Sequence, residues 1–478
     1  MLNAVDTALH VASQRVTDGP TLAVHDPWTG EEIARVVMAD AARAEAATVA
    51  AVRAFDAMRA LSSFDRKSIL AKTADAIAKR QDELATLMAR EAGKPITQAR
   101  AEVQRAIATF QLGAEEATRI VGEVIPLDVT GPSRGYSGSW VRVPAGPVIA
   151  IAPFNFPLNL VAHKIAPALA CGCSIVLKPP PQAPLSSLLL AECIRGAGAP
   201  PDAVQIVPCD VDVAERLVKD DRFATLSFTG SAKVGWHLKA IAGKKRVLLE
   251  LGGNAAVLAH DDANLARVGD RVTSGAFAYA GQVCIKVQRL YVHRKIADAV
   301  VADVVSRAKK LAPSSPLDEA SVVGPMIDEA NARRVESWIA KAVAAGARVL
   351  CGGTREGNRL APTVLEFDGD GRGLEVVEEE IFGPVLTVHR YDTWDEALRM
   401  ADGTRYGLQA GVFTDSHARI REAFARLHVG GLVVNDIPTF RVDVMPYGGT
   451  RDSGFGREGV RFAIEEMTER KLLVVRDG

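Results

Sequence analysis

From residue 147 onward, short runs of β-branched and apolar residues alternate with helix-like stretches. The runs occupy 148–152, 174–178, 204–207, 224–228 and 246–250, and the helix-like stretches occupy 158–170, 184–196, 212–220 and 232–243. Strands that alternate with helices are joined by parallel βαβ crossovers. The sequence therefore predicts an α/β fold with a doubly wound, Rossmann-like parallel sheet, which binds ligands at the carboxyl ends of its strands.

The segments before this region have helical periodicity. Residues 40–60 and 66–92 are Ala-rich, and Gly93 is suited to end the second stretch. Apolar residues then recur at three- and four-residue spacing, which predicts one buried stripe of a long helix. The members of this stripe are Val103, Ile107, Phe110, Ala114, Ala117 and Val121. Residues 122–144 contain turn-forming Gly and Pro residues, so we expect an extended arm or hairpin there.

A second alternating region covers residues 252–463. We expect helices near 261–280, 295–311, 328–346 and 416–427, and strands near 287–293, 347–351, 385–390 and 409–414. The apolar run 471–475 predicts a terminal strand, which pairs either with the 122–144 arm or with another subunit.

The length of 478 residues exceeds one hydrophobic core, so several domains are expected. We expect one α/β domain from 1–121 and 145–251, a second α/β domain from 252–463, and a small β arm from 122–144 and 464–478. The 57 basic and 58 acidic side chains nearly cancel and form no basic patch, which argues against nucleic acid as a partner.

No apolar run reaches the ~20 residues that a membrane span needs, and the first residues do not resemble a secretory signal. Six cysteines are too few for a disulfide scaffold in a chain of this length, and no metal-binding spacing is present. We therefore expect reduced cysteines, no metal, no membrane partner and a cytoplasmic location.

Two short motifs suggest covalent catalysis. Glu250 ends an apolar run, and Cys284 lies in Gly281-Gln282-Val283-Cys284. A cysteine nucleophile needs a thiolate and a later base that activates water. Taken separately, Glu250 is equally explained as an ion-pair partner, and Cys284 as an inert core residue.

Two further motifs follow predicted strands. Asn155, in the Pro153–Pro157 turn, is suited either to stabilise an oxyanion or to cap a helix. Gly230–Gly235 follows a strand and opens a helix, where backbone N–H groups bind phosphate. Its spacing is not G-x-G-x-x-G, so a plain tight turn is the alternative.

Together these motifs, in this order, resemble the aldehyde dehydrogenase superfamily over almost the whole chain. The remaining matching landmarks are Lys178-Pro179, Phe228-Thr229-Gly230-Ser231, Glu250-Leu251-Gly252-Gly253, Glu380-Ile381-Phe382-Gly383-Pro384 and Pro446-Tyr447-Gly448-Gly449. The stretch 437–443 is most similar to the lactaldehyde dehydrogenase-like branch.

The resemblance implies roles for five catalytic residues. Cys284 is the expected nucleophile, which forms a thiohemiacetal and then a thioester, and Asn155 stabilises the oxyanion. Glu250 is the expected base that hydrolyses the thioester. Lys164 and Glu458 are expected to complete a proton path from that base to bulk water.

The resemblance also implies an NAD or NADP cofactor, bound by the domain of residues 1–121 and 145–251. It further implies that 252–463 is the catalytic domain and that the β arm serves oligomerisation. In this scheme Ser231 binds the pyrophosphate, Lys178 the adenosine ribose, and Glu380 the nicotinamide ribose, against which Phe382 packs. The other expected cofactor residues are Ile151, Pro153, Phe154, Pro181, Phe228, Thr229, Gly230 and Gly252. Members that prefer NAD usually carry Glu at the position of Pro181, so we expect NADP to be at least tolerated.

The implied substrate is a small aldehyde, such as lactaldehyde, glycolaldehyde or a short semialdehyde. Its expected contacts are Val103, Arg105, Phe156, His163, Val283, Ile285, Arg441 and Tyr447. Arg441 is suited to hold a carboxylate or hydroxyl group of the substrate, and pairing with Asp443 is the equal alternative.

The predicted function is therefore NAD(P)-dependent oxidation of an aldehyde to its acid by a homodimer or homotetramer. Acyl transfer to coenzyme A is the second interpretation, and the presence of Glu250 argues against it. A catalytically inactive scaffold with the same fold is the third; it predicts loss of the nucleophile, base or oxyanion donor, and all three are present.

Overall fold

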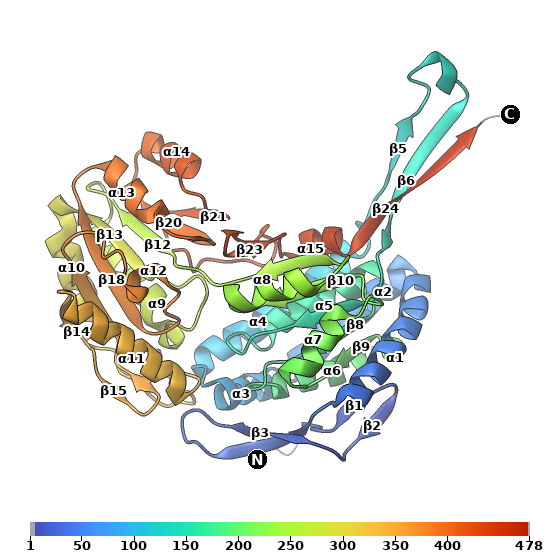
Figure 1. Cartoon of the computed structure of the whole chain (residues 1–478), viewed down its shortest axis with the longest axis horizontal. Helices are drawn as coiled ribbons and strands as arrows, with labels where there is room; N and C mark the ends of the chain where they lie inside the picture. The colour runs from blue at the N-terminus through green and yellow to red at the C-terminus, as the bar shows by residue number, and fades with distance from the viewer. Residues whose placement is uncertain (1–4, 477–478) are drawn as a thin grey trace.

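The computed structural model describes residues 5–476. Two large sheets lie side by side, and a three-stranded sheet projects from the body as an arm (Figure 1). The ends of the predicted domain ranges, 1–4 and 477–478, lie outside the described residues. Within the described residues, no helix is long and apolar enough to cross a membrane.

The first sheet has the strand order β23-β11-β10-β7-β8-β9, and its neighbours are parallel except for β23. Its strands are β7 (Val148–Ile151), β8 (Ile175–Lys178), β9 (Val204–Ile206), β10 (Thr225–Thr229), β11 (Arg246–Glu250) and β23 (Gly454–Phe455). The helices between them are α5 (Asn159–Cys171), α6 (Leu185–Gly196), α7 (Val211–Lys219) and α8 (Ala232–Ile241). This confirms the predicted doubly wound sheet.

Alternate residues of these strands face two different hydrophobic cores. Val148 and Ala150 of β7 pack into one core with α5, α6 and the helix Ile96–Glu116, whereas Ile149 faces the other core with α7 and the helix Ala41–Ala60. Because successive side chains of a strand point to opposite faces, a sheet covered by helices on both sides needs apolar residues at every position.

The preceding segment forms α1 (Ala41–Ala60), α2 (Ser63–Lys79), α3 (Gln81–Ala92) and α4 (Ile96–Glu116). The predicted stretch 66–92 is two helices, because the backbone turns at Arg80 (φ −110°, ψ 21°). Gly93 ends α3 in the left-handed region (φ 66°), as predicted. The predicted stripe is wrong at Val121, because α4 ends at Glu116 and Val121 is 69% exposed.

The amino-terminal residues add two hairpins, and short elements connect the large ones. The hairpins are β1 (Leu9–Val11) with β2 (Gln14–Val16) and β3 (Thr21–His25) with β4 (Glu32–Val37). The connecting strands are β15 (Arg355–Glu356), β16 (Arg359–Leu360), β19 (Tyr406–Gly407) and β22 (Thr450–Arg451).

The second sheet has the order β14-β17-β18-β13-β12-β20-β21. Its strands are β12 (Ala256–Ala259), β13 (Arg289–His293), β14 (Arg348–Cys351), β17 (Thr363–Phe367), β18 (Val385–Tyr391), β20 (Gln409–Phe413) and β21 (Gly431–Val434). Its helices are α9 (Leu265–Phe277), α10 (Arg294–Ala308), α11 (Glu329–Ala344), α12 (Glu375–Glu378), α13 (Trp394–Asp402) and α14 (His417–Arg426). Sequence periodicity missed β12, β17, β21 and α13.

The arm consists of β5 (Glu123–Pro126), β6 (Tyr136–Pro144) and β24 (Thr468–Arg476), in the order β24-β6-β5. The terminal strand pairs with β6 of its own chain over all nine residues. In chain order, β23 and α15 (Val460–Glu466) come after the second sheet and before β24, and both begin within the predicted range 252–463. However, β23 pairs with β11, and α15 packs on α4 and α5. The chain therefore returns to the first sheet before residue 463.

Candidate active site

The carboxyl edge of the first sheet brings three predicted residues into one region. Thr229 and Glu250 are register partners at the ends of β10 and β11. Asn155 lies in the turn that follows β7, the strand next to β10. The chain beyond β11 then crosses to the second sheet, so this edge faces the junction of the two sheets (Figure 1).

Cys284 is held by a loop with an unusual backbone. Tyr279, Ala280 and Gly281 all have positive φ angles (53°, 51° and 65°), which is costly for the two residues that carry a Cβ. A Cβ on Gly281 would lie 2.3 Å from the carbonyl oxygen of Gly383, so only glycine fits there. The Gln282 side chain donates to the carbonyl of Pro325 (3.1 Å) and accepts from the N–H of Ile327 (2.9 Å).

The Cys284 thiol is surrounded by groups that act on its charge in opposite directions. Its Sγ lies 3.3 Å from the Tyr447 hydroxyl. Burial raises the pKa of Cys284 to about 11, and the nearby carboxylates of Glu380 and Glu250 act in the same direction. The Tyr447 hydrogen bond and the Arg441 guanidinium oppose this increase.

Asn155 is directed at the loop that carries the thiol. Its Nδ2 donates to the carbonyl of Gln282, two residues before Cys284, at 3.0 Å. Its own carbonyl accepts from Lys94 Nζ at 2.8 Å. The Asn155 side chain does not cap α5, because the backbone N–H groups of Leu158 and Asn159 donate to Glu102 instead (3.0 Å each).

Glu250 is buried, with only 3% of its surface exposed, and neither carboxylate oxygen has a hydrogen-bond partner among the residues that the structure describes. Burial, together with repulsion from Glu458, raises the pKa of Glu250 well above its usual range. Gly448 lies directly against the carboxylate, since a Cβ there would be 2.8 Å from Oε1. A buried carboxyl group without a partner is typical of a functional residue.

Lys164, Glu458 and Arg441 form a buried network behind this carboxyl group. Lys164 Nζ donates to Thr229 Oγ1 (2.7 Å), Ser227 Oγ (3.1 Å) and Glu458 Oε1 (3.3 Å). Arg441 Nη2 donates to Glu458 Oε2 at 3.1 Å. Burial alone would raise the pKa of Glu458, but these two cations lower it to about 2. Two cations therefore share one carboxylate.

Asp443 does not pair with Arg441. It accepts instead from Arg105 Nη2, at 2.6 Å, and lies 2.8 Å from His163 Nε2. The structure therefore does not realise the alternative of an Arg441–Asp443 pair, and the charge of Arg105 is already neutralised. Burial and the charge of Arg441 lower the pKa of His163, so its ring is neutral. With Nε2–H donating to Asp443, the buried and unpartnered Nδ1 is an acceptor.

The residues predicted for the nicotinamide end lie together. Glu380 Oε1 accepts from the N–H of Gly253 at 3.0 Å, and a Cβ on Gly252 would collide with the same carboxylate. Burial raises the pKa of Glu380 to about 7. Phe382, with a positive φ of 45°, packs edge-on against Phe154 with 5.9 Å between ring centroids.

The predicted adenosine end is more open. Ser231 is exposed at the start of α8, its side chain caps no N–H group, and Pro181 is exposed. Lys178 ends β8, and its ammonium group donates only to the neighbouring Pro179 carbonyl (3.3 Å) among the described residues. The N–H of Gly230 donates to Glu250 O at 3.0 Å and fixes the turn that follows β10. Ile151 ends β7, Pro153 lies just beyond it, and Phe228 is the last but one residue of β10.

The predicted substrate residues differ in their surroundings. Val283, Ile285 and Tyr447 pack in one small apolar cluster around Cys284. Phe156 lies beneath Lys94, whose Nζ is 3.5 Å from the ring centroid. Val103 is fully buried in the main core.

Sequence reasoning missed Lys94 and Glu102, a buried ion pair beneath the site. Lys94 lies over the rings of both Phe156 and Tyr279 and donates to Asn155, so it connects the Asn155 turn with the Cys284 loop. The only sequence signal is that Glu102 falls beside Val103 on the buried stripe of α4, where a charge needs a partner.

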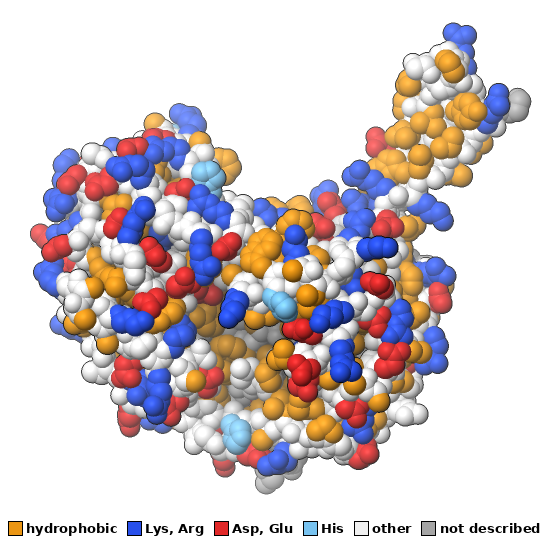
Figure 2. Space-filling view, viewed as in Figure 1, with side chains coloured by type: hydrophobic (Ala, Val, Ile, Leu, Met, Phe, Trp, Pro, Cys, Tyr) orange, Lys and Arg blue, Asp and Glu red, His pale blue; other side chains and the backbone are white. Residues whose placement is uncertain are grey.

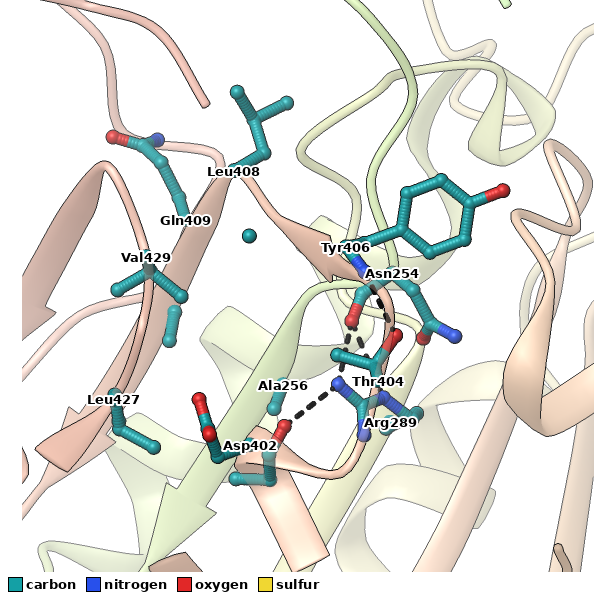
Figure 3. A pocket seen from close by; sticks show the side chains of 13 residues that line it. Asn254, Ala256, Arg289, Asp402, Thr404, Tyr406, Leu408, Gln409, Leu427 and Val429 are labelled. Carbon is teal, nitrogen blue, oxygen red and sulfur yellow. Dashed lines mark hydrogen bonds between the residues drawn. The ribbon is translucent and has the colours of Figure 1, made fainter. Parts of the chain in front are cut away.

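A separate small pocket lies behind the chain that follows Glu250, and no predicted site residue lines it (Figure 3). The buried Arg289 donates to the carbonyls of Asn254 (2.8 Å) and Ala401 (3.0 Å) there. Asn254 Nδ2 in turn donates to the carbonyl of Val377 (2.5 Å). These bonds hold the Gly252–Gly253 segment against the second sheet.

Comparison with known proteins agrees with this geometry. Residues 15–473 match the profile of the aldehyde dehydrogenase family. The chain is 40% identical to a 3-sulfolactaldehyde dehydrogenase of Priestia aryabhattai over 469 residues, covering 98% of this chain and 97% of the relative. It is also 40% identical to a lactaldehyde dehydrogenase of Methanococcus aeolicus over 425 residues, covering 87% and 89%.

Two solved structures share the fold over nearly their full length. One is aldehyde dehydrogenase 21 of Physcomitrella patens in complex with the product succinate, with 43% identity, a TM-score of 0.96 and 98% coverage of both chains. The other is a glyceraldehyde-3-phosphate dehydrogenase of Methanocaldococcus jannaschii complexed with NADP, with 37% identity, a TM-score of 0.92, and coverage of 96% and 100%. The predicted family is confirmed: this chain belongs to the aldehyde dehydrogenase family and is an NAD(P)-dependent enzyme that oxidises aldehydes.

Proposed function

We propose that the enzyme oxidises its aldehyde through a thioester on Cys284 and releases the free acid with Glu250 as the base. The observation that carries this proposal is the convergence of Cys284, Asn155 and the unpartnered Glu250 carboxyl group at one sheet edge. Attack of the thiolate on the aldehyde carbon gives an oxyanion, which the Asn155 amide stabilises. Glu250 then removes a proton from the water that attacks the thioester.

The cofactor site fits a nicotinamide dinucleotide. The uncapped start of α8 at Ser231 suits a pyrophosphate, and Glu380 suits ribose hydroxyl groups. When bound, the nicotinamide accepts the hydride that leaves the thiohemiacetal carbon. Lys178 has an almost free ammonium group and Pro181 carries no charge, so a ribose 2′-phosphate meets attraction without repulsion. We propose that NADP is accepted at least as well as NAD.

We propose that the substrate is a short aldehyde carrying an anionic or hydroxyl group. Lys164 and Arg441 share a single carboxylate, and the Arg441 Nε is buried without a partner, which favours an anion. The unpartnered Nδ1 of His163 is suited to accept from a substrate hydroxyl. The relatives named for sulfolactaldehyde and lactaldehyde, and the succinate complex, have substrates or a product of this kind.

One assay tests these proposals together. Lactaldehyde, glycolaldehyde, succinic semialdehyde and propanal are each mixed with enzyme and either NAD or NADP, and formation of reduced cofactor is followed at 340 nm. We expect turnover without coenzyme A, and none with Cys284→Ala. A strict requirement for coenzyme A, or full activity of Cys284→Ala, would overturn the mechanism. A hundredfold preference for NAD would overturn the cofactor proposal.

Arg441→Ala, with Arg441→Lys as the matched control, tests the substrate class. We expect KM for succinic semialdehyde to rise about tenfold or more in the alanine variant, because it loses a charged hydrogen bond. KM for propanal should change little. An equal change for both aldehydes would assign Arg441 a structural role only.

A further inference from the structure

A cysteine nucleophile acts as its thiolate, and the surroundings of Cys284 hinder ionisation. Four charged or titratable groups face the thiol: Glu250 at the end of β11, Glu380 after α12, and Arg441 and Tyr447, both in the loop after β21. Two of them are carboxyl groups, which oppose a thiolate when they are ionised. Burial also raises the thiol pKa, and the Tyr447 hydrogen bond and the Arg441 charge act against this increase. Some donor must therefore stabilise the anion.

Tyr447 is placed to be that donor. Its side chain is 3% exposed, and Cys284 Sγ, at 3.3 Å, is the only hydrogen-bond partner of its hydroxyl among the described residues. The backbone N–H of Tyr447 donates to Glu458 O (3.1 Å), and the N–H of Glu458 donates back to Tyr447 O (2.6 Å). The ring also packs against Ile285 and Leu408. The hydroxyl is thus fixed at the sulfur.

The Arg441 guanidinium lies over the Tyr447 ring, with its carbon 3.7 Å from the ring centroid. A cation stacked on an aromatic face withdraws electron density from the ring. This makes the phenol a stronger hydrogen-bond donor. Burial also raises the pKa of Tyr447 well above its usual range, so the phenol stays protonated and its O–H group can donate a hydrogen bond.

We propose that Tyr447 is a catalytic residue, whose hydroxyl donates a hydrogen bond to the Cys284 sulfur and stabilises the attacking thiolate, with Arg441 strengthening the bond. The S–H bond breaks heterolytically and its proton leaves to water, while the Tyr447 O–H bond stays intact, so no oxidant is needed. This proposal rests on Cys284 being the nucleophile of the proposed function. It gives Tyr447 a role in the chemistry beyond lining the substrate pocket.

The test is the pH dependence of Cys284 alkylation by iodoacetamide, with the modified peptide identified by mass spectrometry. Tyr447→Phe keeps the ring and its packing but removes the donor. We expect its alkylation midpoint to rise by about one to two pH units, since a hydrogen bond to a charged group is lost. At pH 7.5 alkylation should slow about tenfold or more. Arg441→Gln, which removes the stacked cation, should shift the midpoint in the same direction.

Tyr391→Phe is the matched control, because Tyr391 is also buried but its hydroxyl donates to the carbonyl of Ala259 in the second sheet. Its alkylation profile should equal that of the wild type. A Tyr447→Phe profile equal to the wild type would overturn the proposal, and so would an equal shift in both phenylalanine variants. Alkylation needs no aldehyde or cofactor, so failure of the proposed function would appear separately, as absent cofactor reduction by the wild-type enzyme.

Discussion

Glu250 occupies an environment that stabilises its protonated form and therefore limits its action as a base. Its carboxyl group is buried and has no hydrogen-bond partner within residues 5–476, and the charges of Glu458, Arg441 and Lys164 act on its pKa. The same conditions keep the carboxyl group available, because no donor competes with the water that it must activate. At the scale of single residues, the proposed activation of water thus depends on the two Glu250 carboxylate oxygens being free to accept a hydrogen bond.

Replacing Glu250 with Gln should separate the two halves of the reaction. The amide cannot accept a proton, so the thioester should accumulate after one rapid equivalent of reduced cofactor. We expect steady-state turnover to fall about 10²–10⁴-fold. Stopped-flow absorbance at 340 nm measures both the burst and the later rate. An unchanged steady-state rate would show that Glu250 is not the base.

The raised pKa of Glu250 also predicts a pH profile. The base must be unprotonated, so turnover should increase as pH rises through the pKa of Glu250. The midpoint of this increase should lie well above the usual carboxyl pKa of about 4 to 5. The rate of acyl-enzyme hydrolysis measured against pH checks this expectation. The expectation would be contradicted if the rate increased with its midpoint in the usual carboxyl range, or if the same increase persisted in Glu250→Gln.

At the scale of elements, the ion pair of Lys94 and Glu102 joins the segment after α3 to the start of α5 and to the Cys284 loop. Glu102, on α4, accepts from Lys94 and from the N–H groups of Leu158 and Asn159. The buried carboxylate thus fixes the segment after α3 and the start of α5, and Lys94 extends this contact to Tyr279 in the Cys284 loop. Because Lys94 also donates to the backbone carbonyl of Asn155, this ion pair helps to hold Asn155 in place.

Lys94→Met should destabilise the enzyme by about 3 kcal/mol or more, because it leaves Glu102 buried without its cation. Adding Glu102→Gln should recover part of this loss, since the amide oxygen still accepts from the two N–H groups. Urea unfolding followed by circular dichroism compares the three proteins. Equal stability of Lys94→Met and the wild type would mean that the pair contributes nothing.

At the scale of the whole molecule, the projecting arm exposes apolar side chains that a monomer would leave in water (Figure 2). The exposed apolar residues of its strands are Val124, Val141, Leu472, Leu473, Val474 and Val475. Contiguous apolar surface of this kind marks an interface. We infer that the arm pairs with another copy of the chain to form a dimer or tetramer.

Leu473→Asp together with Val475→Asp should therefore reduce the oligomer to a smaller species, because burying a carboxylate in an apolar interface is unfavourable. Light scattering coupled to size exclusion gives the mass. Glu469→Lys, a change at an exposed charged position of the same strand, is the control. If the double variant keeps the wild-type mass, or if the wild type is a monomer, the arm is not the interface.

Local patterns predicted β7 to β11 of the first sheet to within a few residues, but they missed β23 in that sheet and β12, β17, β21 and α13 in the second part of the chain. The missed strands β12 and β17 are buried at every position, and such short apolar runs show no alternation. The predicted catalytic residues lie in ordered motifs of a few residues each. Motifs of this kind are local, so they can be read before the fold is known.

The sequence by itself determined the α/β fold and the family, and it singled out Cys284, Glu250 and Asn155 as candidates, because periodicity and short motifs are properties of neighbouring residues. Only the tertiary structure decided that Arg441 pairs with Glu458, that Asp443 holds Arg105 and His163, and that Tyr447 reaches the sulfur. Such pairs join segments brought together by sheet pairing and helix packing. Their energies depend on distance and burial, which neighbouring residues in the sequence do not encode.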